Sequence, residues 1–158
     1  MNWQEVCEHP SLKNLPFKIE LDEYGQIIMS PVKIYHSILQ GEIEFILRSL
    51  LKEGKTLPEC AIKTSKGTKV ADVAWVSLDL LSKIKGETEA STAPEICVEI
   101  ISTSNTKKEM AEKRQLYFEA GAKEVWLCNE NGELSFFNAE QKLIHSVLVP
   151  KFPEKIEM

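Results

Sequence analysis

Two short apolar segments, each interrupted by a carboxylate, constrain this chain more than any other feature. Residues 68–76 are TKVADVAWV and residues 95–102 are EICVEIIS. Side chains alternate between the two faces of a β-strand, so Asp72 shares its face with apolar residues, and Glu99 lies in a segment that is apolar on both faces. An ionised carboxylate in such surroundings costs several kcal/mol unless a cation compensates it. The sequence therefore predicts a basic side chain or a metal ion close to both strands.

Periodic patterns of apolar residues on either side of these segments alternate between strand and helix types. Strands are expected at residues 17–21, 26–29, 59–64, 68–77, 95–102, 125–128, 134–137 and 143–149, and helices at 2–8, 34–52 and 106–120, with a shorter helix within 79–93. Turn residues at 23–25 and at Asn131-Gly132 join neighbouring strands and predict a β-hairpin near each end. The expected fold class is α/β (α+β), a mixed β-sheet flanked by helices with N-terminal and C-terminal β-hairpins, in a single domain over residues 1–158.

Charge and composition narrow the classes of function. The chain has 19 Lys and Arg against 24 Asp and Glu, a net charge of −5, which argues against a protein that coats nucleic acid through overall basicity. Locally basic stretches at 63–69 and 107–114 still offer contacts for phosphates. No apolar run is long enough to span a bilayer and the N-terminus lacks a secretory pattern, so we expect no membrane association and a cytoplasmic location. The four cysteines form no CxxC pair, so neither a disulfide framework nor a zinc finger is expected.

A lysine on the helix that follows Glu99 is the first candidate for the compensating cation. Lys113 lies on the inward stripe of the expected 106–120 helix, where it can reach back over the end of the preceding strand. One interpretation is a structural ion pair without chemistry, in which Lys113 or Arg114 neutralises the carboxylates. The other is a site where Asp72 and Glu99 hold a hard divalent ion such as Mg²⁺ and the lysine supports an attacking water or a phosphate.

Taken in order, the motifs resemble those of the PD-(D/E)XK nuclease superfamily and, within it, the bacterial Uma-type family of candidate restriction endonucleases. The matching residues are Met29-Ser30-Pro31 with His36, Ala71-Asp72-Val73, Val98 to Ser104 (VEIISTS), Lys113 with Tyr117, and Gly121 to Leu127 (GAKEVWL). The resemblance covers nearly the whole chain. Ala71 replaces a proline of the family pattern. Ile101 stands where a lysine is expected two residues after Glu99, so the resemblance implies that Lys113 has taken the lysine's role.

The resemblance implies a restriction-endonuclease-like fold and a divalent-metal-dependent DNA endonuclease that hydrolyses phosphodiester bonds. The implied metal ligands are Asp72, Glu99 and the main-chain carbonyl of Ile100, with Mg²⁺ as the cofactor and Mn²⁺ as a substitute. Lys113 is the implied catalytic lysine. The alternative is a catalytically inactive nuclease-fold protein that serves as a binding or interaction module, which the acidic net charge favours.

Two residues of the expected 34–52 helix are further candidates for a catalytic role. His36, near the helix start, either assists a water or phosphate or is a packing residue. Glu42 borders the expected inward face and is a candidate third acidic ligand. Glu44, by contrast, is spaced to pair with Arg48 and is discounted.

The predicted C-terminal hairpin points to a partner. Phe136 and Phe137 are adjacent, so the hairpin over residues 134–149 presents aromatic side chains on both faces. One of these faces needs a partner protein to bury its aromatic side chain. Superfamily members that cut both strands of a duplex often pair two active sites, and the resemblance implies the same arrangement. We therefore expect a homodimer that binds DNA.

Overall fold

A computed structural model describes residues 1–158 of the chain. Its helices are α1 (Trp3–Glu8), a 3-10 helix (Pro10–Leu12), α2 (Ile34–Leu50), α3 (Leu78–Ile84) and α4 (Lys107–Glu119). Its strands are β1 (Phe17–Leu21), β2 (Ile27–Pro31), β3 (Gly54–Thr64), β4 (Gly67–Ser77), β5 (Ile96–Ile100), β6 (Glu124–Cys128), β7 (Leu134–Phe137) and β8 (Lys142–Leu143). Strands β1 and β2 form a hairpin, and the other strands form a mixed sheet in the order β3-β4-β5-β6-β7-β8. This arrangement confirms the predicted class, a mixed sheet flanked by helices.

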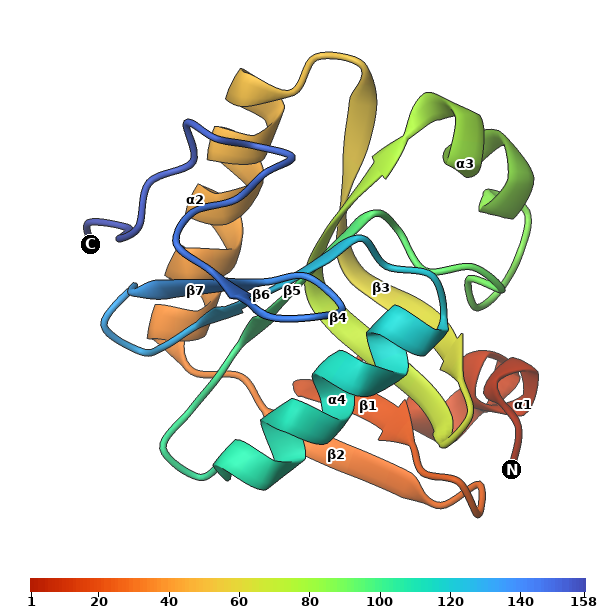
Figure 1. The fold of residues 1–158 in the computed structure, drawn as a ribbon. Coiled ribbons are helices and arrows are strands. Elements are labelled where there is room, and N and C mark those ends of the chain that lie inside the picture. The colour runs from red at the N-terminus through yellow and green to blue at the C-terminus, as the bar shows by residue number, and fades with distance from the viewer.

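Helices cover both faces of the larger sheet, and Figure 1 shows α2 and α4 on opposite sides of the strands. The β5–β6 pair is parallel, and every other neighbouring pair is antiparallel. On one face, Leu39, Ile43 and Leu47 of α2 pack with the C-terminal segment against the strands. On the other face, Tyr117 of α4 is buried and contacts Glu99, so this face holds the candidate carboxylate.

None of the helices has the length and apolar character that crossing a membrane requires.

The β1–β2 hairpin is docked beside β4 through close backbone contacts, and Figure 1 shows it below α4, near the lower end of that strand. Gly67 begins β4 with a φ of +91°, a conformation that glycine adopts at little cost. A Cβ atom at Gly67 would lie 2.3 Å from the carbonyl oxygens of Leu21 and Asp22, so only glycine lets the end of β1 approach this closely. The Val70 N–H then donates a 2.7 Å hydrogen bond to Glu20 Oε2. The hairpin is thereby held with Glu20 facing β4.

Strand β3 is longer than the sequence predicted. Helix α2 ends at Leu50 and not at Lys52, and β3 begins at Gly54, whereas a start at Glu59 was expected. The first half of β3 pairs with the second half of β4 and includes Pro58. Because β3 is at the edge of the sheet, only one of its sides pairs with another strand, and proline is tolerated in strands of this kind.

The end of the chain is less regular than the sequence predicted. Instead of a strand over residues 143–149, β8 covers only Lys142–Leu143, and the following residues join the core on the α2 side. The physical reason lies in the buried carboxylate of Glu124. It accepts hydrogen bonds from the N–H groups of Val147 and Leu148, which a strand would have used for pairing.

The adjacent aromatic residues of β7 are both covered by the chain itself. Phe136 packs edge-on against Trp126, with ring centroids 5.0 Å apart. On the opposite face, the Arg114 guanidinium lies 3.8 Å from the centre of the Phe137 ring. Neither ring needs a partner subunit, so the observation behind the expected homodimer no longer supports it. Because Arg114 contacts Phe137, its guanidinium is directed away from the candidate carboxylates.

Candidate active site

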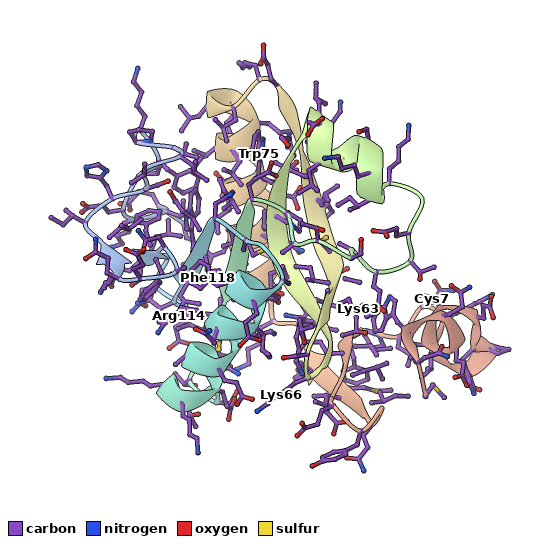
Figure 2. The ribbon with its side chains drawn as sticks, turned by 45° about the vertical axis from the view of Figure 1, so that its right-hand side comes forward. Cys7, Lys63, Lys66, Trp75, Arg114 and Phe118 are labelled. Carbon is purple, nitrogen blue, oxygen red and sulfur yellow. The ribbon has the colours of Figure 1, made fainter.

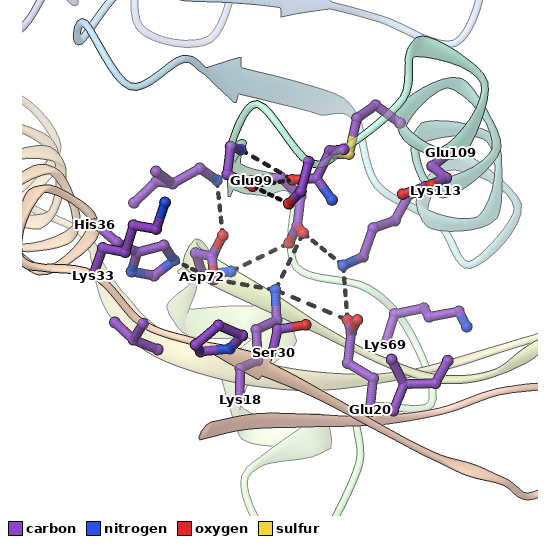
Figure 3. Close-up of a pocket in the computed structure, with 18 of the residues that line it drawn as sticks. Lys18, Glu20, Ser30, Lys33, His36, Lys69, Asp72, Glu99, Glu109 and Lys113 are labelled. Carbon is purple, nitrogen blue, oxygen red and sulfur yellow. Dashed lines mark hydrogen bonds and ion pairs between the residues drawn. The ribbon is translucent and has the colours of Figure 1, made fainter. Parts of the chain in front are cut away.

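Acidic and basic side chains from five separate elements meet around one cavity of about 660 Å³. They are Lys18 and Glu20 of β1, His36 of α2, Asp72 of β4, Glu99 of β5 and Lys113 of α4. Figure 3 shows these side chains converging, with ion pairs and hydrogen bonds between them. The sheet supplies the two most buried carboxylates of this cluster, and the docked hairpin and α4 supply the ammonium groups.

Asp72 is almost fully buried, and both of its carboxylate oxygens are held. Its Oδ2 atom accepts a 2.7 Å hydrogen bond from the Ile100 N–H on the neighbouring strand. Its Oδ1 atom lies 3.1 Å from Lys18 Nζ and 3.0 Å from His36 Nε2. Burial by itself would raise the pKa of Asp72, but the Lys18 ammonium and the His36 ring outweigh burial and hold that pKa well below the usual aspartate range. Asp72 is therefore an anion near neutral pH.

Glu99 is also buried, and its two oxygens have different kinds of partner. Its Oε2 atom accepts hydrogen bonds from the Tyr117 hydroxyl at 3.1 Å and from the Asp72 N–H at 3.3 Å. Its Oε1 atom lies 2.6 Å from Lys113 Nζ and 3.2 Å from Lys18 Nζ. Burial raises the pKa of Glu99 above its ordinary value, although both lysines oppose that rise. As the pH falls, Glu99 is therefore the first carboxylate of the cluster to take up a proton.

The two carboxylates present one oxygen each to a shared cation. Asp72 Oδ2 and Glu99 Oε2 are fixed by main-chain N–H groups and a phenol, whereas Asp72 Oδ1 and Glu99 Oε1 both contact Lys18. Lys18 Nζ also lies 3.9 Å from Glu20 Oε2. Burial would lower the pKa of Lys18, but the three surrounding carboxylates outweigh burial and raise it above its ordinary value. Lys18 is thus a permanent ammonium ion at the centre of the cluster.

The oxygen atoms around Lys18 are of the type that a hard divalent ion prefers. Carboxylate oxygens are the usual protein ligands of Mg²⁺, and Asp72 Oδ1 and Glu99 Oε1 already share one cation. As the side chains stand, no group of three or more His, Cys, Asp or Glu residues is arranged to hold a metal ion. The residues therefore fit a divalent ion by donor type and charge, on the condition that Lys18 moves from its place between them.

The structure brings most of the predicted site residues together. Asp72, Glu99, Lys113, His36 and Ile100 all line the cavity. Lys113 points into it, with its ammonium on Glu99 as the helical stripe predicted. Their catalytic and metal-binding roles stay predictions.

The prediction for Glu42 is wrong. Its side chain is exposed on α2 and does not line the cavity. Leu39 and Ile43 face the core, and Glu42 lies on the flank of the helix that is turned away from the sheet. Glu44 pairs with Arg48 at 3.4 Å, as its spacing predicted.

Sequence reasoning missed Lys18 and Glu20. In residues 17–21 these two alternate with apolar side chains, which is the ordinary pattern of a strand with one solvent-facing side. Docking of the hairpin beside β4 turns that polar side into a wall of the cavity. No local pattern distinguishes the two situations, so the sequence held no sign of their role.

Some of the basic side chains expected to contact phosphates are already engaged. Figure 2 shows Lys66 near the lower end of the β3–β4 hairpin, where it pairs with Glu112 of α4 at 2.7 Å. Lys69 lines the cavity and donates a hydrogen bond to the Leu21 carbonyl. Lys63, on the same hairpin, is exposed.

Comparison with known proteins points to a nuclease fold. No curated protein matches the chain. Among solved structures, it is similar to the crystal structure of a putative nuclease belonging to DUF820 from Anabaena variabilis. The TM-score is 0.71 with 17% sequence identity, and the similarity covers 89% of this chain and 81% of that one. At that identity the likeness shows the fold alone.

A family model provides the assignment that the structural likeness cannot. The model is described as Uma2, putative restriction endonuclease, and it matches residues 3–157. That range includes every side chain of the cavity cluster described above. The chain therefore belongs to the Uma2 family of putative restriction endonucleases.

Proposed function

We propose that this chain is a divalent-metal-dependent nuclease that hydrolyses phosphodiester bonds in DNA. The observation that carries the proposal is the pairing of Asp72 Oδ1 and Glu99 Oε1 around one cation, at 3.1 and 3.2 Å from Lys18 Nζ. Fixed donors hold the other oxygen of each carboxylate, so the pair is oriented before any ion arrives. The nuclease fold and the family support the same conclusion.

Four residues of the cluster, Asp72, Glu99, Lys113 and His36, have roles in this proposal. Asp72 and Glu99 would hold Mg²⁺ or Mn²⁺, together with the Ile100 carbonyl. The ion, when bound, supplies positive charge for a phosphate and activates a water molecule. Lys113, next to Glu99, stabilises negative charge that develops on the phosphate oxygens. His36 holds Asp72 through a 3.0 Å contact and keeps it oriented toward the cavity.

Further lysines provide positive charge for the DNA backbone. Lys33 and Lys69 line the cavity, and Lys107 and Lys108 lie at the start of α4, next to the cavity-lining residues 102–105. Contacts between lysines and phosphates release counterions, so DNA binding should weaken steeply as salt is added.

Calorimetric titration with Mn²⁺ tests the metal site directly. Wild-type protein should bind the ion, and Asp72→Asn and Glu99→Gln should each abolish measurable binding, because each removes an anionic ligand. Glu42→Gln is the matched control, since it removes the same charge from an exposed position outside the cavity. A wild-type protein that gives no metal-dependent heat would contradict the proposal.

Cleavage of plasmid DNA tests the activity. It should require Mg²⁺ or Mn²⁺, stop when a chelator is added, and be absent in Asp72→Asn. Lys113→Met should lose cleavage but keep metal binding, because the lysine is not a ligand. Cleavage that persists in chelator would show that the activity does not come from this site.

A nuclease-fold interaction module without catalysis is the second candidate. The observations that favour it are the net charge of −5 and the pairing of basic side chains within the chain, as in Lys66 with Glu112 and Lys113 with Glu20. Metal binding without any DNA binding at low salt would favour this module over the nuclease.

A further inference from the structure

Lys18 occupies the place between Asp72 and Glu99 that the proposed metal ion would take. Its Nζ atom contacts Asp72 Oδ1 and Glu99 Oε1, the same two oxygens that main-chain and phenol donors leave free. The Lys18 side chain is only 10% exposed, so these carboxylates have replaced most of its water. Mg²⁺ approaches its ligands to about 2.1 Å, so an ion on both oxygens would meet the ammonium at close range, where like charges repel strongly. The ion and the ammonium cannot share those oxygens.

Glu20 is the remaining carboxylate within reach of Lys18. Its Oε2 atom lies 3.9 Å from Lys18 Nζ and 2.8 Å from Lys113 Nζ, and it accepts the Val70 N–H at 2.7 Å. These contacts fix Glu20 against β4, at the edge of the Asp72–Glu99 pair. Lysine has a flexible four-carbon stem, so rotation of the side chain alone can transfer the ammonium toward Glu20 while the backbone stays in place.

We propose that Lys18 is a built-in cation that neutralises the Asp72–Glu99 pair in the metal-free protein, and that Glu20 receives its ammonium when a divalent ion binds. The inference rests on the proposed function and gives two residues of β1 a positioning role in metal binding. Because the ion displaces a positive charge, the metal affinity of the wild-type protein is lower than its carboxylates alone would provide.

Mn²⁺ titration of the full chain tests the displacement of Lys18. Lys18→Gln removes the charge but keeps a hydrogen-bond donor, and it should lower the Kd for Mn²⁺ by roughly tenfold or more, because the ammonium that contacts both Asp72 Oδ1 and Glu99 Oε1 is gone and only Lys113 remains, on Glu99. Lys33→Gln is the matched control. It removes the same charge from the same cavity, but Lys33 forms no ion pair with the cluster, so a much smaller change is expected.

A double-mutant cycle tests the part assigned to Glu20. Glu20→Gln alone should raise the Kd for Mn²⁺, because the displaced ammonium loses its acceptor. In the Lys18→Gln background only the contact of Glu20 with Lys113 is lost, so adding Glu20→Gln should raise the Kd much less than it does in the wild-type background. If Glu20 were instead a metal ligand, the substitution Glu20→Gln would weaken Mn²⁺ binding equally in both backgrounds. That result would overturn the role assigned to Glu20.

The outcomes separate this inference from the function on which it rests. Wild-type binding with no gain in Lys18→Gln, or an equal gain in Lys33→Gln, overturns the displacement of Lys18 and leaves the metal site standing. No binding by any variant overturns both. If Lys18→Gln does not fold, as circular dichroism would show, the ¹⁵N signal of the wild-type Lys18 ammonium still decides. Added Mg²⁺ should shift that signal, and an unchanged signal under saturating metal overturns the inference.

Discussion

Glu99 and Glu124 are both buried carboxylates, on neighbouring strands of one sheet, but their partners differ in kind. Glu99 of β5 contacts two ammonium groups and lines a cavity. Glu124 of β6 accepts four hydrogen bonds from neutral donors, which are the Trp126 indole, the Ser146 hydroxyl and the N–H groups of Val147 and Leu148. Glu124 thus ties the C-terminal segment to the sheet, and its oxygens are filled by groups that belong to the fold.

This difference separates a structural carboxylate from one that can take a ligand. Main-chain N–H groups cannot leave Glu124 without unfolding the segment that carries them. The ammonium groups on Glu99 are at the ends of flexible side chains and can move while the backbone stays in place. Burial of a carboxylate in a strand therefore does not identify a site by itself. A buried carboxylate oxygen whose only partners are the ammonium groups of flexible side chains is a better indication that a ligand can bind there.

The largest expected effect is on stability, at Glu124. Glu124→Gln keeps one carbonyl oxygen and replaces the other oxygen by an NH₂ group, which cannot accept a hydrogen bond. The buried donors that contacted the replaced oxygen therefore lose their acceptor. We expect the free energy of unfolding to fall by roughly 2–4 kcal/mol, measured by urea denaturation. Mn²⁺ affinity of the folded variant should stay at the wild-type value. Glu140→Gln, an exposed position nearby in the chain, is the control. A loss of metal binding in Glu124→Gln would break the comparison.

A smaller effect at neutral pH, with a clear pH dependence, is expected for Asp72→Asn. The pKa of Asp72 in the folded protein lies below its ordinary value of 3.8, so its ionised form stabilises the fold above that pH. The stabilisation is lost as the pH falls through the lower, folded-state pKa. Asparagine does not ionise, so the variant should lack this part of the acid-induced loss.

At neutral pH, the free energy of unfolding of Asp72→Asn should differ from that of the wild type by less than about 2 kcal/mol, since lost ion pairing and relieved desolvation oppose each other. Urea denaturation at a series of acidic pH values gives both results. Parallel loss of stability in the two proteins below pH 3.8 would show that Asp72 is not the group responsible.

Tyr117→Phe sharpens the comparison by removing one fixed donor from Glu99. The phenol hydroxyl holds Glu99 Oε2 at 3.1 Å, and its loss should cost about 1 kcal/mol of stability. Because Glu99 can then rotate, Mn²⁺ binding should weaken modestly as well. Tyr35→Phe is the control, because it removes the hydroxyl of a tyrosine that lines the cavity but makes no hydrogen bond to the carboxylates. Equal effects of the two variants on the Kd would count against a positioning role for Tyr117.

The smallest effect is expected where a carboxylate is open to solvent. Lys66 and Glu112 pair at 2.7 Å, but both side chains are about half exposed, at 48% and 46%. Water and salt screen such a pair, so Lys66→Gln should leave the free energy of unfolding unchanged within error.

DNA affinity should fall more in Lys63→Gln than in Lys66→Gln, because Glu112 already neutralises Lys66. Filter-binding or anisotropy titrations at several salt concentrations would show whether the order is reversed.

The sequence predicted those parts of the site that stand out against an apolar pattern. Asp72 and Glu99 interrupt buried strands, and Lys113 interrupts the inward stripe of a helix, so each is visible within its own segment. Glu42 was misplaced because periodicity gives the width of a helix face but not which flank of it lies over the sheet.

Other parts of the molecule depend on contacts between distant segments, which no local pattern records. Lys18 and Glu20 belong to a strand whose polar side is buried only by docking against β4. Glu124 is the first residue of an otherwise apolar strand and resembles an ordinary strand end, and its burial depends on residues 146–148, which fold back over it. The same fold-back removed the strand expected over residues 143–149.

The close fit between Gly67 and the end of β1 has a consequence for the order in which the protein assembles. This contact joins segments far apart in the chain, and such contacts tend to form late, because closing a long loop is entropically unfavourable until other contacts compensate. Until the hairpin docks, Asp72 and Glu99 lack the ammonium of Lys18 and face water. Before docking, Lys113 is the one ammonium group that contacts the pair, and it reaches Glu99 alone, so the negative charges are fully compensated only when the hairpin adds Lys18. Pulsed hydrogen exchange during refolding should accordingly show amides of β5 and β6 protected before those of β1.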